Sequence, residues 1–249
     1  MPPSIGKRWR ILSLALGGLG AAASPACCAQ DAIGGHLAVT TDYVFRGVSQ
    51  TRGAPAVQAD LHYQTSSGWF IGTWGSTVDL NRGPGATVEL NAYGGRSWPL
   101  SGSWNARIAA VHYAYPNDTA SLRYDYDELI GSLAFRDRLA ASVAWSPNTS
   151  RYSRYGAAVD RTGVTYDLVG RWPLFGPFAA SGSAGYYDLD DLFGTGYGYW
   201  SAGIEVVLAS LQFDLGYFSA GDQATDLFGP ESTGSRWSFT AVWRFQRTN

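Results

Sequence analysis

Hydrophobic and polar residues alternate most clearly over residues 36–50 of the chain. Leu37 and Val39 begin an apolar series at every second position, and Asp42 and Arg46 fall on the positions between. Because successive side chains of a β-strand point to opposite faces, this pattern predicts one strand with an apolar face and a polar face. In a water-soluble sandwich the apolar face would pack on a core. In an outer-membrane barrel it would face lipid, and the polar face would line the lumen.

The same period of two recurs along the chain and predicts twelve strands of about eight to twelve residues. In the fifth of these segments the alternation changes phase near Val111 and His112, which predicts a β-bulge there. The predicted strands cover residues 35–48, 54–65, 68–78, 86–96, 103–115, 124–135, 138–146, 163–172, 178–187, 199–208, 211–218 and 236–245.

The lengths of the connections separate the two possible folds. Connections after even-numbered strands are short: 66–67, 97–102, 136–137, 173–177 and 209–210. Those after odd-numbered strands are long and polar, except for 49–53: 79–85, 116–123, 147–162, 188–198 and 219–235. This sorting predicts an all-β fold, a single closed antiparallel transmembrane β-barrel with short periplasmic turns and long extracellular loops. Closure removes both sheet edges, so the first and twelfth strands are expected to pair.

Aromatic residues gather near the two ends of the predicted strands, as expected for two belts at the surfaces of a bilayer. The alternative is that aromatic residues simply favour strands. The predicted loop-side belt is Tyr43, Phe45, Trp74, Tyr113, Tyr115, Tyr124, Trp145, Tyr186, Trp200, Tyr217 and Trp237. The predicted turn-side belt is Trp69, Trp98, Trp104, Phe135, Trp172, Phe178, Phe213, Trp243 and Phe245.

The first 29 residues differ in character from the rest. Three basic residues precede an apolar run over residues 11–23, and small residues precede a cleavage position after Ala29. This pattern predicts a secretory signal peptide at residues 1–29 and a barrel domain at residues 30–249. The alternative is a lipid-modified Cys27.

Removal of that segment changes the composition in two ways. Both cysteines lie within it, so disulfides would not stabilise the remaining chain. Residues 30–249 carry 15 arginines against 20 acidic residues, a formal charge of −5, which gives no support for nucleic-acid binding. No later segment has the 18 consecutive apolar residues of a transmembrane helix. The composition therefore agrees with a barrel.

Several motifs resemble a known proteobacterial family. TTDYVFRGVSQT (residues 40–51), followed by G-x-PAVQA (residues 53–59), is similar to the start of the TorF-like porins, an outer-membrane family of conserved hypothetical proteins. SGWFIGTWGSTV (67–78), VELNAYGG (88–95) and the Tyr-rich strand around residues 113–116 continue the similarity, which is looser in the later strands. The resemblance implies an outer-membrane barrel with a channel role, located in a bacterial outer membrane, and it implies no catalytic residues.

Charged residues on the predicted polar faces are the candidates for the pore lining. Acids outnumber arginines among them, which would favour cations. The interpretation is a porin-like channel for passive diffusion of small hydrophilic solutes, and the alternative is that the same residues pair across strands and fill a plugged barrel. The candidates are Asp42, Arg46, Asp60, His62, Glu89, Glu128, Asp167, Arg171, Glu205, Asp214 and Arg244.

Two further hypotheses belong to other classes of protein. A membrane-embedded lipid hydrolase would need a serine beside a histidine base, but the chain has no G-x-S-x-G motif, and His62 is better explained as a polar lumen residue. An adhesion or structural barrel would use its long loops to bind an outside partner. The acidic run at Asp188, Asp190 and Asp191 has too few ligands to predict a calcium site. No metal or cofactor is predicted; outer-membrane lipid and small solutes are the expected partners, with homo-oligomers possible.

Overall fold

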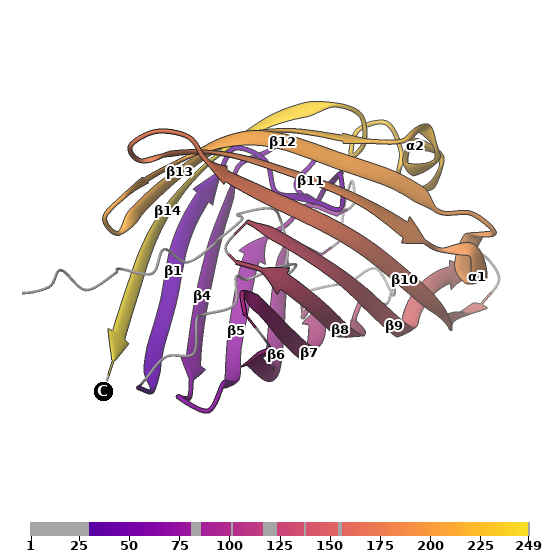
Figure 1. Cartoon of the computed structure of the whole chain (residues 1–249). Coiled ribbons are helices and arrows are strands. Elements are labelled where there is room, and N and C mark those ends of the chain that lie inside the picture. Colours follow the sequence, from indigo (N-terminus) through magenta and orange to yellow (C-terminus); the bar gives the residue numbers. More distant parts are fainter. Residues whose placement is uncertain are drawn as a thin grey trace, which may run out of the picture.

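The computed structural model describes residues 30–80, 86–100, 102–116, 124–136, 138–153 and 156–248. Within these ranges, twelve antiparallel strands hydrogen-bond in a closed ring, as the sequence pattern predicts (Figure 1). Two more short strands, β2 and β3, form a separate hairpin, and two short helices lie between barrel strands. The predicted signal peptide at residues 1–29 lies outside the described residues.

The elements follow one another around the barrel in chain order. The barrel strands are β1 (Ala32–Thr40), β4 (Ala56–Gln64), β5 (Trp69–Thr77), β6 (Val88–Pro99), β7 (Trp104–Ala114), β8 (Tyr126–Phe135), β9 (Leu139–Ser153), β10 (Gly156–Pro173), β11 (Phe178–Asp188), β12 (Tyr197–Leu208), β13 (Leu211–Ala220) and β14 (Arg236–Thr248). The remaining elements are β2 (Val44–Phe45), β3 (Val48–Ser49), α1 (Asp190–Phe193) and α2 (Asp222–Phe228). Both helices are far too short to cross a membrane, and no other helix in the described ranges could do so.

The ring closes where the first strand meets the last. β1 pairs with β14 from Ala32 opposite Thr248 to Thr40 opposite Thr240, and its other edge pairs with β4. The predicted pairing of the first and twelfth strands is therefore confirmed. Every barrel strand has a partner on both edges, so backbone groups that would cost several kcal/mol each in lipid are satisfied within the protein.

The two faces of the wall differ in the way the alternation predicts. On β1, Leu37 and Val39 are 52% and 55% exposed on the outside, whereas Ala38 and Thr40 are buried inside. Large apolar side chains are exposed in the same way around the ring, for example Ile71, Ile108, Leu133, Leu168 and Leu215. An apolar exterior around a polar interior is the reverse of a soluble protein and is typical of a barrel that faces lipid.

The two ends of the barrel differ in how the strands are connected. At one end, here called the turn end, the strands are joined across residues 65–68, 100–103, 136–138, 174–177 and 209–210. At the other, the loop end, the connections are longer, except between β9 and β10, and they include the hairpin β2–β3 and the helices α1 and α2. The prediction that loops are sorted by strand parity is therefore confirmed for every connection except that one, where β9 ends at Ser153 and β10 begins at Gly156.

One predicted loop is mostly strand. Residues 147–153 and 156–162 extend β9 and β10 toward the loop end, where the two strands end beside α1 (Figure 1). Its polar composition predicts a loop, but backbone pairing in a hairpin does not need apolar side chains. The pairing of β9 with β10 has register shifts between Gly156 and Val159 and between Arg161 and Gly163.

β7 itself is regular, so the predicted bulge at Val111 and His112 is wrong. The strand pairs without interruption with β6 and β8. Val111 points into the lumen and is buried, while His112 points outward and is exposed. The phase change is thus a reversal of polarity at two neighbouring positions, with an apolar residue inside and a polar residue outside.

The first predicted strand, residues 35–48, is also wrong beyond Thr40. The chain leaves the wall there and turns back through β2 and β3. Arg46 and Gly47, with φ of 50° and 76°, form the turn of this hairpin in the left-handed region. The alternation continues past Thr40 because the hairpin is itself made of strands, so the pattern gave no sign of the break.

The aromatic belts are confirmed in part. Trp145, Tyr186, Trp200 and Trp237 are exposed on the outside near the loop end, as predicted, and so are turn-side residues such as Trp172. Other members of the predicted loop-side belt face the interior instead: Tyr43, Trp74, Tyr113 and Tyr115 are buried in one cluster, and Phe45 and Tyr124 pack against it. They sit at the correct height but on the lumen face.

Candidate functional site

The lumen at the loop end contains a segment of the chain itself. Residues 41–55, here called the lumen hairpin, include β2 and β3 and contact walls formed by strands far apart in sequence. At the hairpin turn, a Cβ on Gly47 would lie 2.7 Å from Tyr199 Cβ and 3.0 Å from Ala220 Cβ. Glycine at this position therefore lets the hairpin approach β12 and β13 closely. The backbone of Ser49 donates to the carbonyl of Ser232, 2.7 Å away.

A buried ion pair joins the tip of the lumen hairpin to the wall. Arg46 Nη2 lies 2.7 Å from Glu128 Oε1 on β8, and the two side chains are 8% and 1% exposed. The guanidinium also lies over the rings of Phe45 and Tyr187, with 4.6 and 4.7 Å from its carbon to the ring centres. Removing one partner of such a buried pair strongly destabilises a protein, because the other charge then stays buried without a partner.

A second polar network holds the base of the lumen hairpin. The carboxylate of Asp42 accepts hydrogen bonds from the hydroxyls of Ser49 and Thr51 at 2.5 and 2.9 Å. It also accepts one from Arg236 of β14 at 3.0 Å. The hydroxyl of Ser238, also on β14, donates to the backbone carbonyl of Asp42. Asp42 therefore fixes the fold of the hairpin and ties it to the last strand.

Aromatic side chains fill the space around the lumen hairpin. Tyr43 packs edge-on against Trp74 of β5, with ring centres 5.5 Å apart. Tyr113 and Tyr126, from β7 and β8, stack in parallel at 4.3 Å, and the hydroxyl of Tyr113 donates to Glu128. The loop half of the lumen is thus occupied by packed rings and paired charges.

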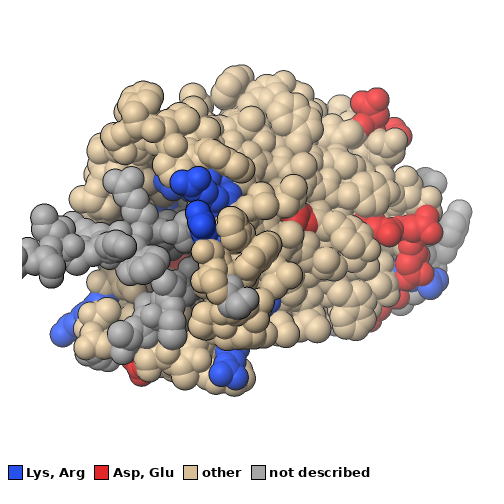
Figure 2. Space-filling view, in the orientation of Figure 1, with Lys and Arg blue, Asp and Glu red and all other residues tan. Residues whose placement is uncertain are grey.

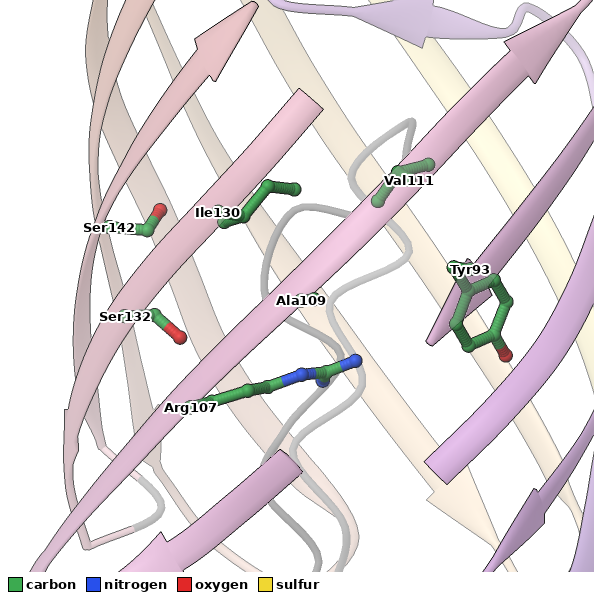
Figure 3. A pocket seen from close by; sticks show the side chains of 7 residues that line it. All are labelled: Tyr93, Arg107, Ala109, Val111, Ile130, Ser132 and Ser142. Atoms are coloured by element: carbon green, nitrogen blue, oxygen red, sulfur yellow. The ribbon is translucent and has the colours of Figure 1, made fainter. Parts of the chain in front are cut away.

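Toward the middle and the turn end, the lumen is polar and less filled. Asp60 on β4 accepts from the hydroxyl of Tyr93 at 2.6 Å and lies 2.6 Å from His62 Nδ1. Arg107 of β7 extends across the interior toward Tyr93 and lines a cavity of about 20 Å³ that Ser132 and Ser142 also border (Figure 3). A cavity of this size has room for about one water molecule.

A second polar cluster faces this region from β10, β12, β13 and β14. Arg171 Nε donates to Glu205 Oε2 at 2.7 Å, and both side chains are buried. Asp214 lies directly opposite Glu205 in the β12–β13 ladder and accepts two hydrogen bonds from the amide of Gln212. Arg244 of β14 lies near both acids, close enough to interact electrostatically with them.

The structure brings most of the predicted pore-lining residues to the interior, in the positions that their parity predicts. Asp42 and Arg46 differ, because they belong to the lumen hairpin and not to the wall. The residues that point inward from the barrel strands are Asp60, His62, Glu89, Glu128, Asp167, Arg171, Glu205, Asp214 and Arg244. Within the interior, Glu89 pairs with Asn91, and Asp167 accepts from Tyr199. Their role as a pore lining remains a prediction.

Sequence reasoning missed two inward-pointing arginines. Arg107 belongs to the strand whose faces the phase change near Val111 left unassigned. Its neighbours Trp104 and Ile108 are exposed outside, and counting from that apolar pair would have placed Arg107 inside. Arg236 begins β14, where its pairing with Asp42, 194 residues earlier, has no local signal.

The described residues offer little support for hydrolytic chemistry. The Asp60–His62 pair has the geometry of a base held by an acid, but the hydrogen bonds of His62 among the described residues are confined to Asp60. No group of three or more His, Cys, Asp or Glu residues with a metal-binding arrangement occurs in the described ranges. The interior is organised around ion pairs between strands.

Acidic and basic side chains are separated along the barrel. On the face shown in Figure 2, most of the acidic surface lies at the loop end beside α1, and most of the basic surface lies toward the turn end. Exposed acids at the loop end include Asp190, Asp191, Asp222, Asp226 and Glu231. On this face, the described surface at the loop end is therefore mainly acidic.

A closed ring of antiparallel strands around a polar lumen is a fold that solved porin structures share. Among solved structures, the NanC porin is similar at 9% identity, with a TM-score of 0.55 over 88% of this chain and 99% of that one. The KdgM porin is similar at 6% identity, with a TM-score of 0.50 over 86% and 99%. By sequence, the chain belongs to the bacterial family of unknown function Gcw_chp, whose model matches residues 22–245. No curated protein matches the sequence. The resemblance to TorF-like porins stays a prediction.

Proposed function

We propose that this protein is an outer-membrane channel for passive diffusion of small hydrophilic solutes, narrowed at the loop end by the lumen hairpin. The observation that carries this proposal is the reversed polarity of the wall. Side chains such as Leu37, Ile71 and Leu168 are exposed outside, while charged side chains point into the lumen. A barrel of this kind is stable only with lipid around it and polar groups or water within.

The orientation follows from the two ends. In bacterial outer-membrane barrels the short turns are periplasmic and the long loops are extracellular. The turn end would then face the periplasm, and the acidic loop end would face the outside. The structures of similar fold include the KdgM porin in complex with disordered oligogalacturonate, a hydrophilic molecule. The solute that crosses this chain is left open by that likeness.

The position of the lumen hairpin favours a narrow passage over a wide one. It crosses the interior with Tyr43, Phe45 and Arg46, and solutes would have to pass between it and the wall. Passage would depend on size, because the hairpin is held on two sides, by Glu128 and by Arg236.

Planar-bilayer recording of the purified full chain tests the proposal. We expect small unitary conductance steps for the wild type, and larger steps for a variant in which residues 43–52 are replaced by a short Gly-Ser linker. Arg52→Ala is the matched control, because it removes the more exposed pair with Asp79 and leaves Arg46 in place. If the wild type gives no unitary steps above background, the channel proposal is wrong, whether or not the linker variant conducts.

A plugged structural or adhesion barrel is the second candidate, and the buried rings around the lumen hairpin favour it. Tyr113 and Tyr43 are almost fully buried, as in a closed core. Under this hypothesis the wild type would be silent and only the linker variant would conduct. The loops at the acidic end would then be the part that contacts an outside partner.

A further inference from the structure

Three arginines are exposed on the outer surface of the barrel near the turn end. Arg96 lies on β6, and Arg136 and Arg138 lie in the turn between β8 and β9. Among the described residues, none of the three forms an ion pair with a carboxylate. Their positive charge is therefore open to an anion from outside the chain.

Arg96 points away from the lumen, onto the apolar outside of the wall. In the ladders it lies opposite Trp69 of β5 and Ile108 of β7, whose side chains are 55% and 50% exposed. Its guanidinium carbon lies 5.3 Å from the centre of the Trp69 ring. An arginine that faces hydrocarbon is costly, and the cost falls close to the level of the lipid headgroups. Arg96 is therefore expected where lipid phosphates can reach it.

The turn between β8 and β9 also places a cation beside aromatic rings. The guanidinium carbon of Arg136 lies 5.1 Å from the centre of the Phe135 ring, which packs on Trp104 with the ring centres 5.0 Å apart. Arg136 Nε also donates to the hydroxyl of Ser103 at 3.3 Å, so the side chain is held close to the wall. Aromatic rings and long cationic side chains are typical of the headgroup level of a bilayer.

The turns on the other side of the barrel carry no charge. Residues 172–178, at the connection of β10 and β11, and residues 206–211, at the connection of β12 and β13, contain no charged side chain. In the first of these turns, Phe175 is 71% exposed. The turn end is thus basic along β6–β9 and uncharged along β10–β13.

We propose that Arg96, Arg136 and Arg138, here called the basic rim, bind the phosphate groups of anionic phospholipids in the bilayer. Guanidinium groups donate paired hydrogen bonds to phosphate oxygens. The acyl chains of the same lipids would pack on exposed wall side chains such as Ile108 and Leu133. A lipid with net negative charge fits better than a zwitterionic one, because these arginines have no carboxylate partner among the described residues that could hold a cationic headgroup.

This proposal rests on the bilayer location that belongs to the proposed function, but it does not rest on conduction. In the orientation proposed above, the basic rim lies in the leaflet on the periplasmic side. Lipid is the occupant that fits, because a water-soluble partner could not reach Arg96 between the lipid-facing side chains of Trp69 and Ile108.

Site-directed fluorescence in lipid vesicles tests the basic rim. With Cys27 and Cys28 replaced by alanine, one introduced cysteine in the full chain is the single site for a fluorophore. Ser103→Cys places the label beside Arg136, and Ser210→Cys places it in the uncharged turn between β12 and β13. The vesicles consist of phosphatidylcholine with a small fraction of spin-labelled lipid, either phosphatidylglycerol or phosphatidylcholine with the same acyl chains.

We expect spin-labelled phosphatidylglycerol to quench the label at residue 103 about threefold to tenfold more effectively than spin-labelled phosphatidylcholine. At residue 210 the two lipids should quench about equally. Equal quenching at residue 103 would prove the proposal wrong. A preference of the same size at both residues would also overturn it, because the basic rim would then not be the source.

Paired variants sharpen this test. Arg136→Gln with Arg138→Gln should lower the preference at residue 103 about twofold to fivefold. Arg52→Gln with Arg161→Gln is the matched control, because it removes the same charge at the loop end and should leave the preference unchanged. A preference that survives the first pair of substitutions, or that the control pair abolishes, would disprove the basic rim.

Arg96 is tested in the same way from the turn between β4 and β5. A label at Ser67→Cys lies two residues before Trp69, and Arg96→Gln should lower the preference measured there. An unchanged preference would remove Arg96 from the basic rim. Loss of the lipid preference in a protein that conducts would refute the rim and keep the channel, and a preference in a protein that does not conduct would do the reverse.

Discussion

The two halves of the lumen are built from the same alternating strands but are occupied differently. In the loop half, the lumen hairpin brings Arg46 and Tyr43 against the wall and buries them among rings. Toward the turn end, His62 remains partly exposed, and small cavities border Arg107 and Glu205. Strand alternation thus decides which side chains point inward, whereas the lumen hairpin decides whether the interior around it is packed or open.

The largest expected effect comes from breaking the buried pair of the loop half. Arg46→Ala leaves Glu128 charged and buried without its partner, and removal of one partner of such a pair costs about 3–5 kcal/mol. We expect a lower midpoint of denaturant unfolding and larger conductance steps, because the hairpin tip is released.

The double variant Arg46→Met with Glu128→Leu is the control for charge burial. Replacing both charges by apolar groups should restore much of the lost stability. Equal stability of the single and double variants would show that the uncompensated charge of Glu128 is not the cause of the loss.

The close approach of the hairpin to the wall is tested by a pair of glycines. Gly47 and Gly53 both have positive φ, of 76° and 80°, but only Gly47 has wall atoms close to its Cβ position. Gly53→Ala should cost about 1 kcal/mol for the backbone conformation alone. Gly47→Ala should cost more, about 2–3 kcal/mol, because it adds a steric overlap. Denaturant unfolding of the two variants measures the difference, and equal losses would mean that the hairpin does not pack on β12 in solution.

A substitution in the turn half of the lumen should cost less stability than Arg46→Ala in the loop half. Asp60→Asn weakens the hydrogen bonds to Tyr93 and His62, but asparagine keeps an acceptor oxygen and the side chain of His62 is 37% exposed, so we expect a loss of about 1 kcal/mol. Denaturant unfolding of Asp60→Asn and of Arg46→Ala compares the stability losses in the two halves directly. A loss as large as that of Arg46→Ala would show that the turn half is as tightly packed as the loop half.

The smallest expected effect concerns Asp31, which precedes β1 at the turn end and lies outside the membrane-spanning strands. Hydrogen bonds from the hydroxyl of Tyr63 and from the backbone N–H of Ser66 lower the pKa of Asp31 below its usual value of 3.8. The folded state thus favours the ionised carboxylate, so its stabilising effect is present above the usual pKa and is lost as the pH falls through the lowered value.

This sign can be checked with Asp31→Asn. The wild type should be slightly more stable than the variant near neutral pH, and the difference should vanish in acid, once the pH falls below the lowered pKa of Asp31. Unfolding measured across that range provides the data. A difference that grows as the pH falls would contradict the assigned direction.

Much of the wall could be predicted from the sequence, because its face assignment depends only on parity. Positions such as Leu37, Asp60 and Glu205 follow from counting along a strand, and the strand number follows from the connections. The contents of the lumen could not be predicted in this way. The hairpin keeps the same alternation as a wall strand, and nothing local distinguishes Tyr43 packed inside from Tyr43 in an outer belt.

The candidate site, too, could be predicted from the sequence only in part. Sequence reasoning selected Arg46, Glu128 and Arg171 as inward residues, but it had no information on which acid each arginine binds. Those partners depend on how strands distant in sequence are brought together across the ring. The pairing of Asp42 with Arg236 is the extreme case, because it joins the first and last parts of the barrel.

That pairing has a consequence for how the molecule is assembled. The seam between β1 and β14 joins the first and last strands of the wall, and Asp42, just after β1, has its cationic partner among the described residues on β14. While the seam is open, the buried acid has no counter-charge and the inserted segment is held on one side only. Closure of the cylinder and docking of its internal segment are therefore linked through the same pair of residues, Asp42 and Arg236.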